Sequence, residues 1–346
     1  MELIALGWTA VRAAQLPGRG RPARVVSQAG PQVYADAGEG PEPVTVPGRL
    51  RTRRAADHPA VGDWVIVEPE TGVVLELLPR SSALQRKVPG AASEAQVLAA
   101  NIDIVLVVAA ADNLNLHRVE RMLGAGWDSG ATPVLVLTKS DLATDAGSLL
   151  EKLRGQLPGV NVVGVAALSG EGLDDIRALV PPGRTAVLLG PSGAGKSTLV
   201  NALFGAEAAA VGAVRSDGKG RHTTVRRQLH GLPGAGLLVD TPGIRELQLW
   251  DETGESVSRA FADIEALALG CRFSNCRHQA EPGCAVQAAV TGGTLSAARL
   301  ESRQRMEAEV AATARRVDAR RRADARRDAR VLARSVRRSS KPGSTG

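Results

Sequence analysis

"RTAVLLGPSGAGKSTLVNALFG", residues 184–205, joins an apolar run, a glycine-rich turn and a second apolar run. Within it, Gly190-x4-Gly195-Lys196-Ser197 matches the phosphate-loop pattern, and its flanks predict the preceding strand and following helix that this pattern requires. The glycines let backbone N–H groups turn towards phosphates, and the helix N-terminus adds its positive end. A chance glycine-rich turn is the alternative. The candidate phosphate-binding residues are Gly190, Ser192, Gly193, Ala194, Gly195, Lys196, Ser197 and Thr198.

Strand-like and helix-like segments alternate on the N-terminal side of this loop. The expected strands are residues 102–110, 132–139, 160–167 and 184–190, and the expected helices are residues 116–127, 146–157 and 172–180. Such alternation is typical of a parallel sheet covered by helices. The centre of the chain is therefore predicted to be an α/β phosphate-loop domain.

A second motif, Thr138-Lys139-Ser140-Asp141, follows one of these strands and is a candidate base-reading loop. Guanine presents two donors, N1–H and N2–H₂, to one carboxylate, whereas adenine presents no such pair. Asp141 would therefore bind guanine while the stem of Lys139 lies along the base. A site built on such hydrogen bonds rejects an analogue without them by roughly 10⁴. The lone tetrapeptide is a weak signal, which the phosphate loop strengthens.

The loop "AALSGEGL" (166–173), after the next strand, resembles the Ser-Ala-x-x-Gly-x-Gly-Leu segment that supports guanine through its backbone. Ala166 occupies the Ser position, so only backbone contacts from Ala166 and Ala167 are expected. A plain strand–helix turn is the alternative.

Two further segments are candidates for the magnesium and γ-phosphate side of the site. Asp240-Thr241-Pro242-Gly243 ends an apolar strand, where Asp240 would hold Mg²⁺ and the Gly243 N–H would meet the γ-phosphate. "GKGRHTTV" (218–225) lies between this motif and the phosphate loop, where a switch segment belongs. Ser197 and either Thr223 or Thr224 would add hydroxyl ligands to Mg²⁺. The alternatives are an ordinary turn and a flexible basic loop.

The order of these motifs is unusual. In the common order of GTP-binding domains the phosphate loop precedes the base loop, whereas here the base loop comes first. Both matches have the expected flanks, so we interpret the order as a circular permutation that leaves the folded site unchanged. The segment after Asp240 then leads directly into the C-terminal region.

All three cysteines of the chain lie within 14 residues, in Cys271-x4-Cys276-x-His278-x5-Cys284. Three thiolates and one imidazole form a closed ligand set that is typical of structural tetrahedral Zn²⁺. Inert buried cysteines are the alternative. The surrounding region 255–295 is predicted to be helical, and residues 296 onward continue as helix.

The first 90 residues predict short strands separated by Gly, Pro and Asp, as in a small barrel. Residues 79–93 are polar and broken by Pro and Gly, which predicts a linker. The barrel carries Arg49, Arg51, Arg53 and Arg54, but its aromatic residues are only Trp8, Tyr34 and Trp64. Trp64 stands at an inward-facing position of an alternating strand pattern, so it is expected in the core and not on an RNA-binding surface. RNA contacts are therefore expected through phosphates and shape more than through base stacking.

The net charge of +7 is unevenly distributed. Residues 313–346 carry eleven Arg and one Lys against three Asp, a local charge of +9 that leaves −2 for the remainder. This tail is predicted to attract a polyanion, RNA in preference to lipid, and a solvated helix is the alternative. No apolar run of about 18 residues and no secretory signal occurs, so a cytoplasmic protein without a membrane partner is expected.

Together, the small β-barrel, the permuted motifs "GPSGAGKSTLVN", "GRHTT" and "DTPGIRE" and the Cys/His spacing resemble the ribosome small-subunit-dependent GTPase family. The resemblance covers nearly the whole chain except the Arg-rich tail. It implies an OB-fold barrel at 1–90, a permuted GTPase domain at 91–253, a helical zinc module at 254–312 and a tail at 313–346. It also implies a monomer that binds GTP or GDP and the 30S subunit with its 16S rRNA. Its GTP hydrolysis would be stimulated by that subunit during late maturation.

The catalytic group is harder to predict. In Ras-like enzymes a Gln after the Asp-x-x-Gly motif orients the attacking water, but here Ile244 stands in that position. His222, in the switch segment, is the candidate replacement because an imidazole can orient or deprotonate water near neutral pH. The alternatives are that His222 only contacts RNA or packs the loop. For the function of the whole protein there are two alternatives. One is a GTP-dependent switch with negligible hydrolysis, and the other is an ATP-using RNA factor, which Asp141 disfavours.

Overall fold

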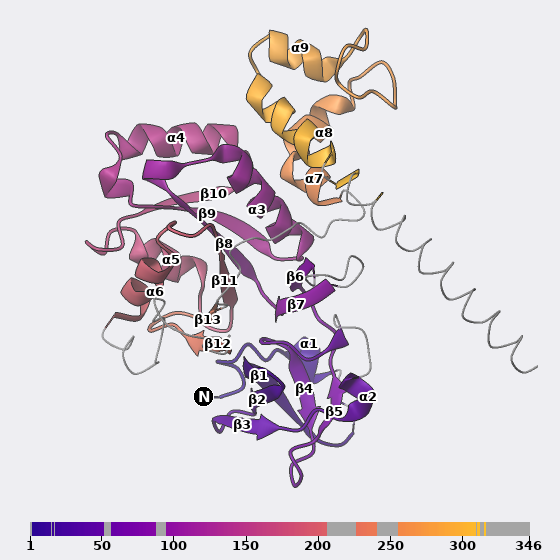
Figure 1. Cartoon of the computed structure of the whole chain (residues 1–346), viewed down its shortest axis with the longest axis vertical. Helices are drawn as coiled ribbons and strands as arrows, with labels where there is room; N and C mark the ends of the chain where they lie inside the picture. The colour runs from indigo at the N-terminus through magenta and orange to yellow at the C-terminus, as the bar shows by residue number, and fades with distance from the viewer. Residues whose placement is uncertain are drawn as a thin grey trace, which may run out of the picture.

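The computed structural model describes most of the chain. The described residues are 2–14, 16, 18–51, 57–87, 95–205, 226–240, 255–308, 310–311 and 315. His222, Thr223, Thr224, Gly243 and nearly all of the Arg-rich tail lie outside these residues. Figure 1 shows a small β-unit, a central α/β sheet and a group of C-terminal helices, one beyond the other along the long axis.

Five antiparallel strands near the N-terminus close into a ring. They are β1 (Arg21–Ala29), β2 (Gln32–Asp36), β3 (Pro41–Val44), β4 (Trp64–Val67) and β5 (Val74–Leu77). β1 pairs with β2 and β4, β2 pairs with β3, and β4 pairs with β5. A parallel bridge between Thr45 and Val73 connects the end of β3 to the start of β5 and completes the circuit. The interior is filled by small β-branched side chains such as Val25, Val33 and Val65. This is the small barrel that the strand pattern predicts.

Two short helices accompany the barrel: α1 (Ala10–Ala13) and α2 (Gly48–Arg51). Trp64 is 1% exposed, as its alternation predicts, and Trp8 packs edge-on against it with ring centroids 4.7 Å apart. One of the barrel's few aromatic side chains is therefore used in the core.

The expected linker 79–93 is partly wrong. Residues Ala83–Lys87 form β6, which pairs antiparallel with β7 (Ala95–Ala100). The Leu84 side chain is buried in the core that also contains residues of the central sheet. A polar sequence can form a strand when its partner lies about ten residues further along the chain, because pairing rather than local propensity decides.

The central sheet contains five parallel strands and one antiparallel strand. The strands are β8 (Ile104–Ala110), β9 (Thr132–Thr138), β10 (Asn161–Val165), β11 (Thr185–Leu189), β12 (Arg226–Gly231) and β13 (Leu237–Asp240). Their spatial order is β10-β9-β8-β11-β13-β12, with β12 antiparallel to β13. β11 follows β10 along the chain, but two strands, β9 and β8, lie between them in the sheet. The order of the motifs along the chain therefore differs from the order of their strands in the sheet.

Helices cover both faces of this sheet, as the alternating pattern predicts. They are α3 (Leu116–Asp128), α4 (Ala146–Gln156), α5 (Leu173–Leu179) and α6 (Lys196–Phe204), with short 3₁₀ turns at Ala111–Asn113 and Ser140–Leu142. Residues of α3 and α4, such as Leu123 and Leu153, share one core with Leu135. Residues of α5 and α6, such as Ile176, form a second core with Val136 on the opposite face. Successive residues of β9 therefore serve opposite cores, which is the period-2 geometry of a strand.

The barrel and the central sheet share a continuous hydrogen-bonded edge. The C-terminal half of β1 pairs with β12, with Ser27 opposite Gln228 and Ala29 opposite Arg226. The N-terminal half of β1 pairs with β4 on that same edge. β1 is thus a strand of both units, a long-range pairing that strand periodicity alone does not predict.

The C-terminal helices are α7 (Glu255–Ala260), α8 (Ala262–Ala268) and α9 (Ala285–Thr291), followed by helical residues from 297. Phe261, Ile264, Val286 and Met306 form their core, and Trp127 of α3 packs against it. The region is helical as expected, except that the segment between α8 and α9, which holds the cysteines, is irregular. None of the helices in the described ranges is long and apolar enough to cross a membrane.

A buried ionic network attaches these helices to α3. The Arg299 guanidinium donates to Glu120 at 3.1 Å and to Asp263 at 2.7 Å, and the Ser302 hydroxyl donates to Glu120. His117 Nδ1 lies 3.0 Å from the Ser302 hydroxyl. Burial raises the pKa of the Glu120 carboxyl, and the bonds from Ser302 and Arg299 partly offset this. The sequence shows no signal for this network because its partners are far apart along the chain.

Removing the cation of this network should strongly destabilise the C-terminal helices. In Arg299→Met, Glu120 keeps a side chain that is 3% exposed but loses its counter-ion. Breaking a buried pair costs about 3–5 kcal/mol. Limited proteolysis at increasing urea concentrations measures the unfolding of the C-terminal region. We expect its urea midpoint to fall by an amount that matches this loss of free energy.

Arg305→Met is the matched control, because the Arg305–Glu301 pair is exposed on both sides and should contribute about 0–1 kcal/mol. Equal shifts in the two variants would contradict the assignment of Arg299 as the attachment.

Candidate nucleotide site and metal cluster

The predicted nucleotide motifs meet at one edge of the central sheet. β9, β10, β11 and β13 are parallel, so their carboxyl ends point the same way. The base loop follows β9, the support loop follows β10, the phosphate loop follows β11, and Asp240 ends β13. In open α/β sheets, ligands bind outside the carboxyl ends of the strands.

The phosphate loop has the backbone that its glycines predict. Gly193 and Gly195 adopt φ values of 80° and 82°, in the left-handed region that favours glycine. A Cβ added to Gly190 would lie 2.5 Å from the Val108 carbonyl oxygen of β8, so only glycine fits there. α6 begins immediately afterwards at Lys196, which aims the first amides of the helix at the loop.

Lys196 folds back over its own loop. Its ammonium donates to the carbonyl oxygens of Gly190 at 2.7 Å and Pro191 at 2.6 Å. Ser197 and Thr198, one and two residues further on, are exposed. These contacts place the ammonium at the mouth of the loop, where a phosphate could take over its hydrogen bonds.

Thr138 connects the base loop to the phosphate loop. Its hydroxyl donates to the Ala194 carbonyl oxygen at 2.6 Å and lies 3.2 Å from the Ala109 carbonyl oxygen. Thr138 is 2% exposed, and a Cβ on Gly195 would lie 3.2 Å from its hydroxyl oxygen. In the described structure Thr138 therefore fixes the spacing of the two loops, a role that the sequence pattern did not indicate.

The two charged residues of the base loop lie at the sheet edge, with Lys139 half-buried and Asp141 exposed. Lys139 adopts a left-handed backbone, with φ 55° and ψ 36°, and its ammonium lies 2.9 Å from Asp112. Asp141 is exposed in the following 3₁₀ turn. Asp112 was missed in the sequence. Asp112 follows β8, which lies parallel to β9, so the loops after the two strands meet at the same edge of the sheet. That position could have pointed to Asp112 from the sequence.

The support loop is a tight turn around Ala166. The Ala166 carbonyl oxygen accepts from the amides of Ser169 at 3.2 Å and Gly170 at 3.0 Å, and Ala166 pairs with Glu171 in an isolated bridge. Ala166 is buried and Ala167 is half-buried. The turn thus presents backbone rather than a polar side chain, as expected from the Ala at the Ser position.

Asp240 lies at the end of β13, beside the phosphate loop strand β11. Burial raises the pKa of its carboxyl, so an adjacent cation would stabilise the ionised form. Gly243 and the segment 218–225, with His222, Thr223 and Thr224, lie outside the described residues. Their predicted roles remain predictions.

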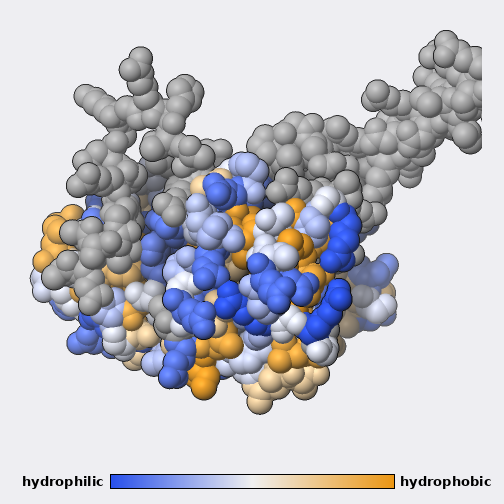
Figure 2. Space-filling model, turned by 90° about the horizontal axis from the view of Figure 1, so that it is seen from below, coloured by the Kyte–Doolittle hydropathy of each residue, from blue (hydrophilic) through white to orange (hydrophobic). Residues whose placement is uncertain are grey.

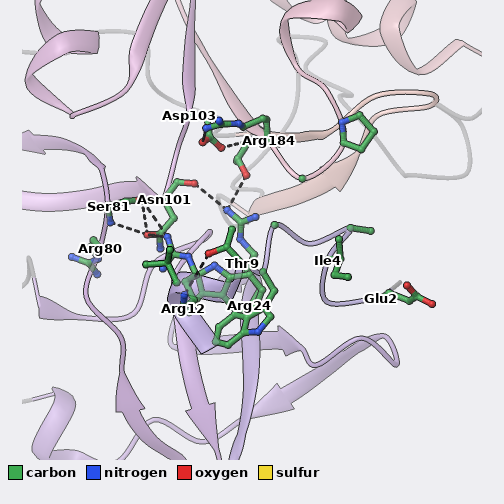
Figure 3. Close-up of a pocket in the computed structure, with 18 of the residues that line it drawn as sticks. Glu2, Ile4, Thr9, Arg12, Arg24, Arg80, Ser81, Asn101, Asp103 and Arg184 are labelled. Carbon is green, nitrogen blue, oxygen red and sulfur yellow. Dashed lines mark hydrogen bonds and ion pairs between the residues drawn. The ribbon is translucent and has the colours of Figure 1, made fainter. Parts of the chain in front are cut away.

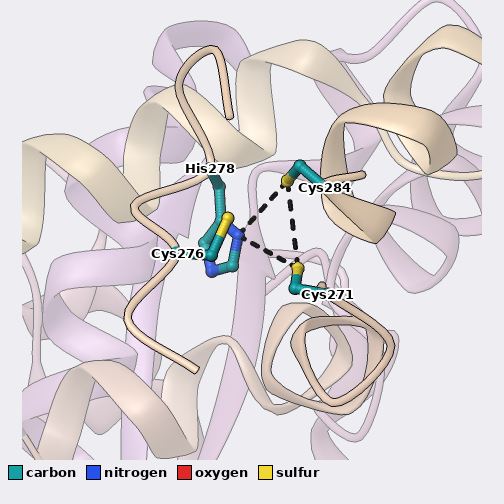
Figure 4. Close-up of side chains that lie close together, drawn as sticks. All are labelled: Cys271, Cys276, His278 and Cys284. Carbon is teal, nitrogen blue, oxygen red and sulfur yellow. Dashed lines mark hydrogen bonds between the residues drawn. The ribbon is translucent and has the colours of Figure 1, made fainter. Parts of the chain in front are cut away.

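The second candidate site is the Cys/His cluster between α8 and α9. The ligand atoms of Cys271, Cys276, His278 and Cys284 all lie within 4.8 Å of one another (Figure 4). His278 Nδ1 is 3.6 Å from Cys271 Sγ and 3.5 Å from Cys284 Sγ, and the two sulfurs are 3.9 Å apart. Ligands about 2.0–2.3 Å from a central ion occupy tetrahedron corners roughly 3.5–3.8 Å apart. The cluster therefore fits a tetrahedral Cys₃His metal site.

The backbone around the cluster is arranged to hold these ligands. His278 has φ 58°, and its carbonyl oxygen accepts from Gln287 Nε2 at 2.6 Å. Cys284 caps α9, where its sulfur accepts from the Gln287 amide at 3.4 Å. Burial and the neighbouring thiols raise the pKa of Cys276 to about 11, although its bond from the His278 backbone opposes this. Crowded thiols resist ionisation together unless a cation neutralises them.

Comparison with known proteins agrees with this geometry. Residues 77–250 match the family model described as RsgA GTPase. A curated relative from Streptomyces avermitilis, named small ribosomal subunit biogenesis GTPase RsgA, is 49% identical over 292 residues, which cover 80% of this chain and 78% of the relative. The chain belongs to the RsgA GTPase family. A further RsgA relative, from Oceanobacillus iheyensis, is 40% identical over 86% of this chain and 87% of its own length.

Solved structures show the same architecture as this RsgA family member. The crystal structure of YjeQ from Thermotoga maritima has a TM-score of 0.64 and 26% identity, and covers 84% of this chain and 98% of its own. YloQ, described as a circularly permuted GTPase, has a TM-score of 0.63 at 22% identity, and the match covers 85% of this chain and 96% of YloQ. The permuted fold inferred from motif order is therefore confirmed, and as an RsgA family member the chain is a GTPase.

Proposed function

We propose that this RsgA family member binds the small ribosomal subunit and hydrolyses GTP during late 30S maturation, with turnover stimulated by the subunit. The observation that carries the proposal is the common edge of β9, β10, β11 and β13, where the base, support and phosphate loops meet. The relatives that are 40–49% identical carry the name small ribosomal subunit biogenesis GTPase.

Guanine selection is assigned to the base loop. Asp141 is exposed and would accept from the two guanine donors, while Lys139, held by Asp112, would lie along the base. Ala166 and Ala167 would contribute backbone groups. The contact between Thr138 and Ala194 would keep the base at a fixed distance from the phosphates.

The phosphates are assigned to residues 190–198. Lys196 would exchange its two carbonyl partners for β- and γ-phosphate oxygens, and amides of the loop would donate to the same oxygens. Magnesium would be held by Ser197, Asp240 and Thr223 or Thr224. The ion would supply charge stabilisation at the β- and γ-oxygens.

The N-terminal barrel is proposed to be an OB-fold that contacts 16S rRNA. Its strand circuit, β1-β2-β3-β5-β4, is a five-stranded ring of the kind that OB-folds form. Figure 2 views the molecule from the barrel end, where hydrophilic residues are interspersed with smaller apolar groups among the described residues. The phosphate contacts are assigned to Arg49, Arg51, Arg53 and Arg54, of which Arg53 and Arg54 lie outside the described residues. We propose the domain limits 1–90, 91–253, 254–312 and 313–346.

The Cys/His cluster is proposed to hold one structural zinc ion. Three thiolates and an imidazole close the coordination sphere, which leaves no position for catalysis. The ion would fix the irregular segment between α8 and α9, which has few regular hydrogen bonds of its own. The C-terminal helices would then transmit movement near Asp240 to the subunit.

GTP turnover with and without purified 30S subunits tests the function. The proposal expects slow intrinsic turnover and a large rise in kcat when subunits are added. The second candidate function, a GTP-dependent RNA-binding switch with negligible hydrolysis, is favoured by Ile244 in the usual Gln position. That switch would bind subunits tightly with GTP and show no rise in turnover.

His222→Ala should lower subunit-stimulated turnover by roughly 10²-fold or more, the scale of a lost acid–base group. Affinities for GTP and for subunits should stay near those of the unaltered chain. A His222→Ala protein with full turnover, or without subunit binding, would place the catalytic role elsewhere.

A further inference from the structure

A cavity of about 790 Å³ opens beside the N-terminal residues. Its walls come from residues 2–12, the barrel strands β1 and β4, the segments 79–81 and 101–103, and residues 182–185 at the start of β11 (Figure 3). None of its lining residues belongs to the base, support or phosphate loops. Its volume is in the range of about 300–1,000 Å³ that is usual for small-ligand sites.

Four arginines line this cavity, and two of them are neutralised. Arg80 is paired with Asp63 at 2.7 Å, and Arg184 is paired with Asp103 at 2.5 Å. Arg12 and Arg24 have no carboxylate within 4.0 Å among the described residues. In Figure 3 the carboxylate of Glu2, at the rim, points away from Arg12. Four arginines against the carboxylates of Glu2, Asp63 and Asp103 leave the cavity with a small net positive charge.

Arg24 is fixed in place below the cavity. It is 2% exposed and donates to the carbonyl oxygens of Leu6, Gly62 and Asn101 and to the Thr185 hydroxyl. Burial, followed by the charge of Arg12, lowers the pKa of Arg24 to about 10, and the charges of Asp103 and Asp63 oppose this shift. The groups that Arg24 contacts directly are neutral oxygens, and its burial limits screening of its charge by water.

Arg12 is held in place through hydrogen bonds from one of its three guanidinium nitrogens. Its Nη2 donates to Asn101 Oδ1 at 2.9 Å and to the Ser81 hydroxyl at 3.2 Å. The N–H groups on Nε and Nη1 have no acceptor within the described structure, and neither nitrogen is a buried unsatisfied atom. Asn101 itself is anchored, since it also accepts from the Ser81 amide at 3.0 Å and donates to Gly62 at 3.0 Å. Both N–H groups of Nη2 are therefore used within the protein, and Arg12 keeps only its Nε and Nη1 donors for a ligand.

The rim beside Arg12 is apolar and open. Ile4 and Val11 are 72% and 74% exposed and both line the cavity, as do Trp8 and Pro182. A cation next to an apolar surface suits a ligand that has a phosphate at one end and a flat or apolar group at the other. A remaining N–H group of Arg12 can donate a charge-assisted hydrogen bond to a phosphate oxygen.

We propose that this cavity is a second phosphate site, which binds one phosphorylated nucleoside, either as a free nucleotide or as part of a single RNA strand. Arg12 donates to the phosphate, Arg24 supplies a fixed positive field, and the rim residues pack against the nucleoside. The site goes beyond the proposed GTPase function and does not depend on it.

The test is a titration of the full chain whose nucleotide site is already saturated with GDP and Mg²⁺. The probes are uridine 5′-monophosphate, uridine without phosphate, and a five-nucleotide oligouridylate. We expect saturable binding of the two phosphorylated probes and at least tenfold weaker binding of uridine. Equal affinities of the monophosphate and the oligonucleotide indicate a free nucleotide as ligand, whereas at least tenfold tighter binding of the oligonucleotide indicates RNA.

Two variants with matched controls complete the test. Arg12→Gln should weaken the phosphorylated probes by tenfold or more, while Arg19→Gln, an exposed arginine outside the cavity, should not. Val11→Glu places a carboxylate at the exposed rim without disturbing the core and should weaken binding, whereas Val11→Gln should not. The proposal is overturned if the unaltered chain binds no phosphorylated probe, or if Val11→Glu and Val11→Gln bind alike.

Discussion

Asp141→Asn is expected to lower the affinity for GTP by several orders of magnitude and to favour xanthosine triphosphate. The side-chain amide can no longer accept from both N1–H and N2–H₂ of guanine, but it can donate to the 2-oxo group of xanthine. Sites built on such hydrogen bonds discriminate by roughly 10⁴. Competition between GTP, xanthosine triphosphate and ATP for a fluorescent nucleotide measures the change.

The control for this variant is Asp174→Asn. Asp174 carries the same charge, but its side chain is 97% exposed, and its one ion pair within the described residues is with Arg177 one turn away on α5. Its nucleotide preference should not change. If Asp141→Asn keeps the GTP affinity of the unaltered chain, residues 138–141 are not the base loop.

Cys276→Ala is expected to release zinc and unfold the C-terminal helices while leaving nucleotide binding largely intact. Structural zinc supplies about 10–16 kcal/mol in small zinc-binding peptides, more than a few short helices gain from packing alone. The three helices α7, α8 and α9 contain six or seven residues each, too short to be stable by themselves. Metal analysis and limited proteolysis measure the effect, and a chelator should reproduce it.

Ser274→Ala lies in the same irregular segment, on an exposed residue outside the cluster, and should retain zinc and resist the protease. Purified protein without bound zinc, or C-terminal helices that stay intact in Cys276→Ala, would contradict the zinc proposal.

Features carried by a few neighbouring residues could be predicted from the sequence. The phosphate loop, for example, needs glycine at 193 and 195 for a left-handed backbone, and the structure shows that backbone at both. The alternating strands and helices of the central sheet follow from apolar periodicity in the same way. The Cys/His spacing likewise brought together four ligands within 14 residues.

Features carried by residues far apart in the sequence could not be predicted. The pairing of β1 with β12 joins residues about 200 positions apart, and neither strand shows a pattern that names its partner. Arg24 and Asn101 illustrate the same limit, because only folding shows that a buried arginine and a left-handed asparagine share a cavity wall. Asp112 and Arg299 are ordinary surface-type residues until their partners, Lys139 and Glu120, are located.

The central claim is that motifs in permuted order assemble one guanine-nucleotide site, and a structure of the chain with a non-hydrolysable GTP analogue and Mg²⁺ tests it most directly. The account predicts that Asp141 accepts hydrogen bonds from the guanine edge, that Lys196 and the amides of residues 190–198 bind the phosphates, and that Asp240 faces the magnesium ion. A base bound away from residues 138–141, or phosphates bound away from the loop before α6, would contradict it.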